Sequence, residues 1–277
     1  MPQARNGAVA IEYETFGAPG APTILLINGL GSQMTRWPEA FCAKLTDKGY
    51  RTIRFDNRDT GLSTWFEPGE AYTLSDMAAD AIAVLDAAGV DEAHVAGVSM
   101  GGMLTQLVAI EHPGRVLSVT SIMSATGAPG TLDSTPEAAA VLTAVPPDPR
   151  ADFEGFLDAA VKNAMVIGSP GFPWPQGVLR ERAAAEYARA FNPTGSQRQM
   201  AAIRGDGDRT GRLGALKVPA VVVHGADDPL VPLAGGKATA AAIPGAELRV
   251  IEGMGHDLPP ALYDLVADAI LAAAARA

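Results

Sequence analysis

Short runs of apolar residues alternate with helical patterns along most of this 277-residue chain, and this alternation constrains the fold more than any other feature. The apolar runs lie at residues 23–28, 51–56, 94–98, 116–123, 220–225 and 247–253. Helical patterns lie at residues 37–48, 75–88, 100–112, 233–242 and 260–276, and Ser75 is a candidate N-cap. Strands that alternate with helices predict an α/β fold, with a mostly parallel central sheet and helices on both faces.

Two segments depart from this pattern. Residues 8–17 alternate apolar and polar side chains, which is typical of an antiparallel strand near the edge of a sheet. Residues 127–213 hold nine of the 21 prolines and show helical patterns without a clear strand. We therefore expect a helical lid at 127–213, inserted after the sixth strand into a core formed by residues 1–126 and 214–277.

Composition narrows the possible partners. The net charge of −10 argues against nucleic acid and against anionic membrane surfaces. The single cysteine, Cys42, cannot form an internal disulfide and is expected to be a small buried side chain. The sequence shows neither an export signal nor an apolar run of membrane-spanning length, so we expect a cytoplasmic monomer or homodimer. With no phosphate-binding loop and no Cys/His cluster, neither a cofactor nor a metal is expected.

The sequence Gly-Val-Ser-Met-Gly at 97–101 follows a predicted strand and opens a predicted helix. A G-x-S-x-G sequence in this position forms a tight turn that lifts the serine oxygen clear of the backbone, at the start of a helix that favours developing negative charge. Ser99 is therefore the candidate nucleophile.

A serine hydroxyl needs a base, and the chain has four histidines. His94 begins the strand before Ser99, and His112 ends the helix after it, so both should be remote from the hydroxyl. His256 follows the last predicted strand in a glycine-containing loop, where ligands bind in parallel sheets. We predict that His256 is the base, with His224 as the weaker alternative.

The histidine in turn needs an acid, and the developing oxyanion needs two N–H donors. Asp227 and Asp228 both follow the penultimate strand, and Asp133 is a more distant candidate. The N–H groups of Met100, directly after the serine, and of Leu30, in the loop after residues 23–28, are the candidate donors.

Taken together, these motifs resemble the α/β-hydrolase superfamily over nearly the whole chain. The motifs are G-V-S-M-G, N-G-L-G at 28–31, F-D-N-R-D-T-G-L-S at 55–63, G-A-D-D-P-L-V-P at 225–232, and G-M-G-H at 253–256. In that superfamily the acid commonly lies four residues before the last proline of the G-A-D-D-P-L-V-P pattern, which selects Asp228. Many relatives carry histidine where this chain has Asn28. Asp56 and Arg58 are expected to be structural anchors.

A closer resemblance is to aclacinomycin methylesterase and related bacterial carboxylesterases, and it implies ester hydrolysis. We therefore expect a Ser-His-Asp hydrolase that acts through an acyl-enzyme on a small to medium ester, including a methyl ester or lactone of a polyketide-like compound. The same residues would also suit a C–C hydrolase, a perhydrolase or a small-molecule receptor. Trp37, Met165, Phe172 and Trp174 are the candidate pocket residues.

Overall fold

The computed structural model describes residues 2–277, which fold around one eight-stranded sheet of order β1-β2-β4-β3-β5-β6-β7-β8. The strands are β1 (Gln3–Asn6), β2 (Val9–Phe16), β3 (Thr23–Ile27), β4 (Arg51–Phe55), β5 (Ala93–Val98), β6 (Val116–Ile122), β7 (Ala220–Gly225) and β8 (Glu247–Ile251). The β1–β2 and β2–β4 pairs are antiparallel, and every other pair is parallel. The predicted α/β class and the antiparallel strand near the edge are both confirmed.

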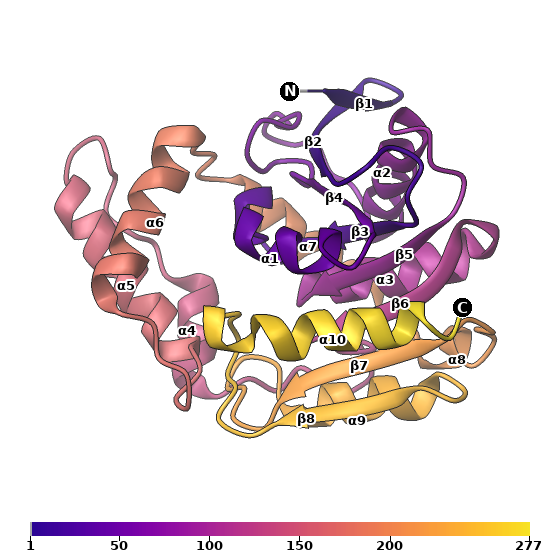
Figure 1. Cartoon of the computed structure of the whole chain (residues 1–277). Coiled ribbons are helices and arrows are strands. Elements are labelled where there is room, and N and C mark those ends of the chain that lie inside the picture. Colours follow the sequence, from indigo (N-terminus) through magenta and orange to yellow (C-terminus); the bar gives the residue numbers. More distant parts are fainter. Residues whose placement is uncertain (1) are drawn as a thin grey trace.

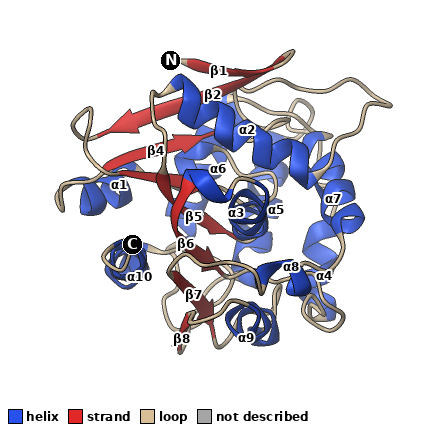
Figure 2. Ribbon diagram, turned by 90° about the vertical axis from the view of Figure 1, so that its right-hand side faces the viewer, coloured by secondary structure: helices blue, strands red, loops and turns tan. Residues whose placement is uncertain are grey.

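Helices cover both faces of this sheet (Figure 2). α1 (Glu39–Thr46) and α10 (Tyr263–Ala274) pack on one face, while α2 (Leu74–Ala87), α3 (Met100–Glu111) and α9 (Leu233–Ala242) pack on the other. Every residue of β3 and β7 is buried, as expected for strands covered on both sides. Short 3₁₀ turns lie at Met34–Arg36, Pro113–Arg115 and Pro260–Leu262.

Two local predictions were incomplete or wrong. β1 was not predicted, because it has four residues and only one of them, Ala4, is buried. The N-cap of α2 is Thr73 rather than Ser75. The Thr73 hydroxyl accepts a hydrogen bond from Asp76 N at 3.1 Å, and the Asp76 carboxylate accepts one from Thr73 N at 2.8 Å. This reciprocal capping box starts the helix two residues earlier than a Ser75 cap would allow.

Cys42 lies buried in α1, where burial raises the pKa of its thiol to about 11. It therefore stays protonated at neutral pH and packs as a small apolar side chain, as expected. None of the helices within residues 2–277 combines the length and the apolar character needed to cross a membrane.

Residues 127–213, named here the helical insertion, connect β6 to β7 and contain no strand. The helices are α4 (Pro136–Thr143), α5 (Phe153–Ile167), α6 (Gln176–Arg189), α7 (Gly195–Asp206) and α8 (Thr210–Leu213). In Figure 1, α4, α5 and α6 lie on the left, the side toward which β7 and β8 point, and thus at the carboxyl edge of the sheet. Ligands bind at this edge in parallel α/β sheets.

Buried ion pairs join the helical insertion to the loop after β4. Arg189 of α6 lies 2.8 Å from the Asp56 carboxylate, and Arg198 of α7 lies 2.7 Å from Asp59. Both aspartate side chains are fully buried. Arg58, between them in sequence, pairs instead with Asp80 of α2 at 2.6 Å. Asp56 and Arg58 therefore anchor this loop, in line with the structural role expected from the sequence.

Candidate active site

Ser99 occupies the turn between β5 and α3 with a strained backbone conformation, φ 56° and ψ −121°. The flanking glycines are required because the chain is packed tightly on either side. A Cβ at Gly97 would lie 2.1 Å from Gly101 O, and a Cβ at Gly101 would lie 2.2 Å from Ile27 O. The turn thus presents the Ser99 hydroxyl at the N-terminus of α3, where the first N–H groups of the helix are free of intrahelical bonds.

The structure brings Ser99, His256 and Asp228 into one hydrogen-bonded line. His256 Nε2 lies 2.9 Å from Ser99 Oγ, and His256 Nδ1 lies 2.7 Å from Asp228 Oδ2. A carboxylate can only accept, so the proton of the neutral imidazole belongs on Nδ1 and Nε2 is left to accept from the serine hydroxyl. His256 is buried except for 9% of its surface.

Asp228 and Asp227 differ completely in their surroundings. Asp228 is buried, and its Oδ1 accepts hydrogen bonds from Leu230 N and Val231 N, both at 2.9 Å, while Oδ2 faces His256. Asp227 is exposed and accepts from Gly253 N at 2.8 Å. The geometry therefore gives Asp228 the position beside the imidazole, and the more distant candidate, Asp133, lies exposed on the surface.

Two of the other histidines, His224 and His94, are engaged elsewhere. His224 Nε2 lies 2.8 Å from the carbonyl oxygen of Val231, to which it donates, and 3.8 Å from Asp228 Oδ2. Burial lowers the pKa of His224, so this ring is neutral and packs behind the aspartate. His94 is buried against the Ser118 hydroxyl at 2.9 Å, and burial lowers its pKa as well. Neither ring is hydrogen-bonded to Ser99.

Two free N–H groups flank the serine. Within residues 2–277, neither Leu30 N nor Met100 N donates a hydrogen bond to a protein acceptor, and both residues line the cavity described below. Gly29 lets the loop after β3 approach the serine, because a Cβ there would lie 3.2 Å from Ser99 Cβ. Two unpaired donors beside a serine hydroxyl are the arrangement that an oxyanion hole requires.

The loop after β3 is held from behind by the helical insertion. Gln199 of α7 is fully buried, and its Oε1 accepts from Gly31 N at 2.7 Å. The Gln199 side-chain amide also donates to Arg58 O and to Thr60 Oγ1, both at 2.9 Å. The side chain of Asn28, which replaces the histidine of many relatives, is buried at the cavity wall without a hydrogen-bond partner. The loop therefore depends on Gln199 rather than on Asn28.

The loop that carries His256 is also attached to the helical insertion. His256 N donates to Ile167 O, the last carbonyl of α5, at 2.7 Å, and Gly255 N donates to Ser169 Oγ at 2.9 Å. Ser169 N and Oγ both donate to the Asp257 carboxylate. Burial raises the pKa of Asp257, although these hydrogen bonds oppose the shift. The imidazole is thus positioned by backbone bonds to α5 as well as by Asp228.

A cavity of about 770 Å³ lies over Ser99 and His256, between the sheet edge and the helical insertion. Its apolar walls include Met103, Ile167 and Leu230, and Trp37 also lines it, as predicted. The structure does not bring the other three predicted pocket residues to this cavity. Phe172 packs against the core cluster of α1 and α10, and the Trp174 ring lies beneath Arg182.

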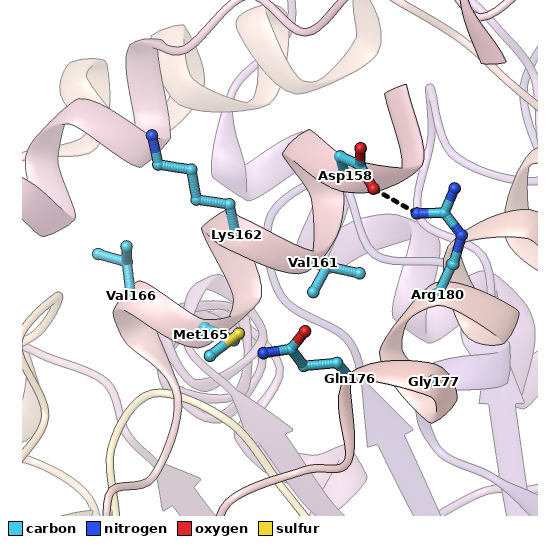
Figure 3. A pocket seen from close by; sticks show the side chains of 8 residues that line it. All are labelled: Asp158, Val161, Lys162, Met165, Val166, Gln176, Gly177 and Arg180. Atoms are coloured by element: carbon cyan, nitrogen blue, oxygen red, sulfur yellow. Dashed lines mark hydrogen bonds and ion pairs between the residues drawn. The ribbon is translucent and has the colours of Figure 1, made fainter. Parts of the chain in front are cut away.

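Met165 lies on the opposite face of α5, in a separate outer groove between α5 and α6 (Figure 3). Its side chain is 53% exposed there, beside Val161, Gln176 and the ion pair of Asp158 with Arg180. The residues of α5 that line the inner cavity are Ala160, Asn163, Ala164 and Ile167. Met165 therefore belongs to the outside of the helical insertion.

The sequence reasoning missed three side chains of this region: Ser169, Arg182 and Gln199. All come from the helical insertion, and Gln199 and Ser169 contact residues 168 and 86 positions away. No local motif marks such contacts, which only the folded chain creates. Residues 2–277 contain no group of three or more His, Cys, Asp or Glu side chains that could hold a metal ion.

Comparison with known proteins places this geometry in a family. The model of the alpha/beta hydrolase fold family matches residues 22–259. The chain is 30% identical to rhodomycin D methylesterase from Streptomyces sp. (strain C5), over 95% of this chain and 94% of that protein. It is 28% identical to 3-oxoadipate enol-lactonase 2 from Acinetobacter baylyi, over 88% and 85% of the two chains.

A solved structure of a hydrolase from Pseudomonas aeruginosa PA01 superposes with a TM-score of 0.71 and 27% identity, covering 96% of this chain and 94% of that one. The resemblance to these proteins therefore extends over nearly the whole chain. The chain belongs to the α/β-hydrolase fold family.

Proposed function

We propose that this protein hydrolyses carboxylic esters with Ser99 as nucleophile, His256 as general base and acid, and Asp228 as the group that orients the imidazole. The observation that carries the proposal is the unbroken line of hydrogen bonds from Ser99 Oγ through His256 to Asp228 at the wall of the cavity. Membership of a hydrolase family and the two named relatives support it.

In the first half of the reaction, His256 Nε2 takes the hydroxyl proton while Ser99 Oγ attacks the ester carbonyl. The carbonyl oxygen becomes an oxyanion, which accepts from the N–H groups of Leu30 and Met100. When the tetrahedral intermediate collapses, the C–O bond to the alcohol breaks and His256 returns its proton to the leaving oxygen. The products are the alcohol and an acyl ester on Ser99.

In the second half, His256 takes a proton from water, whose oxygen attacks the acyl carbon through a second oxyanion. Collapse releases the carboxylic acid and restores the Ser99 hydroxyl with the proton from His256. Asp228 stays ionised throughout and stabilises the imidazolium that forms in both halves.

The size and walls of the cavity suit small to medium esters. A volume of about 770 Å³ lies within the range of small-molecule sites, and the methionine and aliphatic side chains suit an apolar acyl chain or ring. The relatives are a methylesterase and an enol-lactonase, so methyl esters and lactones are the preferred candidate substrates. The helical insertion, which covers the cavity, acts as the lid.

The test is steady-state hydrolysis of p-nitrophenyl esters from acetate to decanoate by wild type and by Ser99→Ala. We expect wild type to turn over many times, and Ser99→Ala to lose at least about a thousandfold in kcat. Ser124→Ala is the matched control, because the Ser124 hydroxyl is buried without a hydrogen-bond partner and its loss should leave kcat within about twofold.

Circular dichroism spectra that coincide for all three proteins would show that each is folded. Retention of wild-type activity by Ser99→Ala would refute the assignment of the nucleophile. A single release of product equal to the enzyme concentration, without further turnover, would contradict a hydrolase and indicate a small-molecule receptor.

A further inference from the structure

The cavity over Ser99 carries positive charge, although the chain as a whole has a net charge of −10. Four arginines contribute to its lining, and Asp257 is the only carboxylate among the lining residues. Two of the arginines are paired: Arg36 with Glu186 and Arg209 with Asp206. The other two, Arg182 and Arg204, form no hydrogen bond or ion pair with any residue of 2–277.

Arg182 differs from Arg204 in its burial. Arg204 is exposed, so water solvates it as it does any surface arginine, whereas Arg182 of α6 is half-buried. Burial, followed by the nearby Arg36, lowers the pKa of Arg182 to about 10, although the charges of Glu186 and Asp257 oppose the shift, so the guanidinium remains charged at neutral pH. A partly desolvated cation that no carboxylate contacts directly is costly, and an anionic ligand would offset that cost.

The guanidinium of Arg182 is oriented by Trp174. Its central carbon lies over the indole ring at 5.0 Å from the centroid, which supports one face of the planar group. Stacking leaves the N–H edges free, and none of the five donors has an acceptor in the described protein. The nearest acid of the cavity wall, Asp257, is occupied by the N–H and hydroxyl of Ser169. A planar fork of donors that is held in place and unpaired is matched to a carboxylate.

We propose that Arg182 binds a carboxylate of the substrate, so that the preferred substrates are esters or lactones with a second, ionised carboxyl group remote from the reacting bond. This inference rests on the proposed ester hydrolysis and specifies its substrate class. The apolar walls contact the carbon chain between the reacting ester and the remote carboxylate. Arg182, on helix α6, binds that carboxylate.

The test uses two esters of equal length that differ only in charge: monomethyl adipate and methyl hexanoate. Acid release at constant pH gives kcat/KM for each. We expect wild type to prefer monomethyl adipate by at least about tenfold, and Arg182→Gln to lose that preference while its kcat/KM for methyl hexanoate stays within about twofold. Arg182→Lys should recover only part of the preference, because an ammonium group lacks the planar fork.

Arg180→Gln is the matched control. Arg180 lies about half a turn away on α6, where it faces the outer groove and pairs with Asp158 (Figure 3). It also pairs with Glu154, so its loss should change neither kcat/KM value. Equal losses on both esters in Arg182→Gln would mean a structural role and would overturn the proposal. So would a wild type that hydrolyses both esters equally well.

A binding measurement separates this proposal from the proposed function. Calorimetric titration of the folded Ser99→Ala variant with the same two esters requires no turnover. Tighter binding of monomethyl adipate, abolished by the added Arg182→Gln change, supports the carboxylate subsite even if wild type proves to be no esterase. Equal binding of both esters overturns the subsite, whatever the outcome of the hydrolysis assays.

Discussion

At the scale of single residues, two adjacent aspartates show how the fold assigns different tasks to identical side chains. Asp228 points inward, where two backbone N–H groups and His256 surround its carboxylate. Asp227 is turned outward and closes the neighbouring loop by accepting from Gly253 N. The sequence around them left both as candidates, and only the family resemblance favoured the second.

Exchanging each aspartate for asparagine provides a direct comparison. In Asp228→Asn the side chain keeps its size but can donate to the ring, which favours the tautomer with the proton on Nε2. We expect kcat for p-nitrophenyl butyrate to fall by about a thousandfold or more. Asp227→Asn retains an acceptor for Gly253 N and should keep kcat within about twofold. Comparable losses in the two variants would exclude Asp228 as the orienting acid.

Some site residues could be predicted because a short sequence motif marks them, whereas no motif marks the pocket residues. Ser99 follows from five consecutive residues and the strand before them, and His256 follows from elimination among four histidines. The pocket residues had no such signal, because both faces of α5 carry apolar side chains. Residues 158, 161, 162 and 165 follow one helical face to the outer groove, while 160, 163, 164 and 167 face the cavity. The sequence alone could not say which face was inward, so Met165 was assigned to the inner one.

At the scale of elements, the prediction succeeded where hydrophobic periodicity is strong. The seven longer strands and the helices of the core were recognised close to their observed bounds, because each packs a continuous apolar run or stripe against the sheet. The prolines indicated that residues 127–213 depart from the α/β pattern. They did not indicate which residues attach this segment to the sheet and its loops. That attachment consists of side-chain contacts, such as Arg198 with Asp59, between segments 139 positions apart.

The Arg198–Asp59 pair should make the attachment of α7 dependent on pH. Burial by itself would raise the pKa of Asp59, but hydrogen bonds from Arg198, Phe66 N and Tyr72 outweigh burial and lower the pKa. Because the folded-state pKa is depressed, the ionised pair stabilises the fold above the ordinary aspartate pKa of about 4, and this contribution is lost as the pH falls through the folded-state value.

Asp59→Asn should therefore lower the free energy of unfolding by about 3 kcal/mol at neutral pH, since it leaves Arg198 unpaired. The difference between wild type and variant should shrink as the pH falls below about 4. Urea unfolding of both proteins over this pH range measures the difference in the free energy of unfolding. Asp133→Asn, at an exposed aspartate, is the control. A difference that stays constant, or grows on acidification, would contradict this assignment.

At the scale of the whole molecule, hydrogen bonds and ion pairs join the helical insertion to the rest of the fold. α6 and α7 are tied to the loop after β4 by Asp56 and Asp59, and Gln199 joins the same loop to the loop after β3. Ala202 and Leu213 of the insertion also belong to the hydrophobic core on the α2 and α3 face. An insertion attached in this way should not unfold separately from the sheet.

Trp174 offers a way to observe the insertion alone. Of the three tryptophans, Trp37 and Trp65 lie outside the insertion, so a Trp37→Phe, Trp65→Phe variant fluoresces only from the insertion. We expect its fluorescence transition in urea to coincide with loss of far-ultraviolet circular dichroism, which reports the whole fold. A fluorescence midpoint at clearly lower urea would indicate a lid that melts independently.

The hydrogen bonds that Ile167 and Ser169 accept from the loop of His256 affect whether the helical insertion can be exchanged between related hydrolases. An insertion that only covered a cavity could be replaced by that of a relative. The substrate range would change, but the catalytic reaction would be retained. Here the same segment supplies acceptors to three backbone N–H groups: the Ile167 carbonyl to His256, the Ser169 hydroxyl to Gly255, and the Gln199 side chain to Gly31 in the loop after β3. We therefore expect a transplanted insertion to support activity only if it brings these three contacts with it.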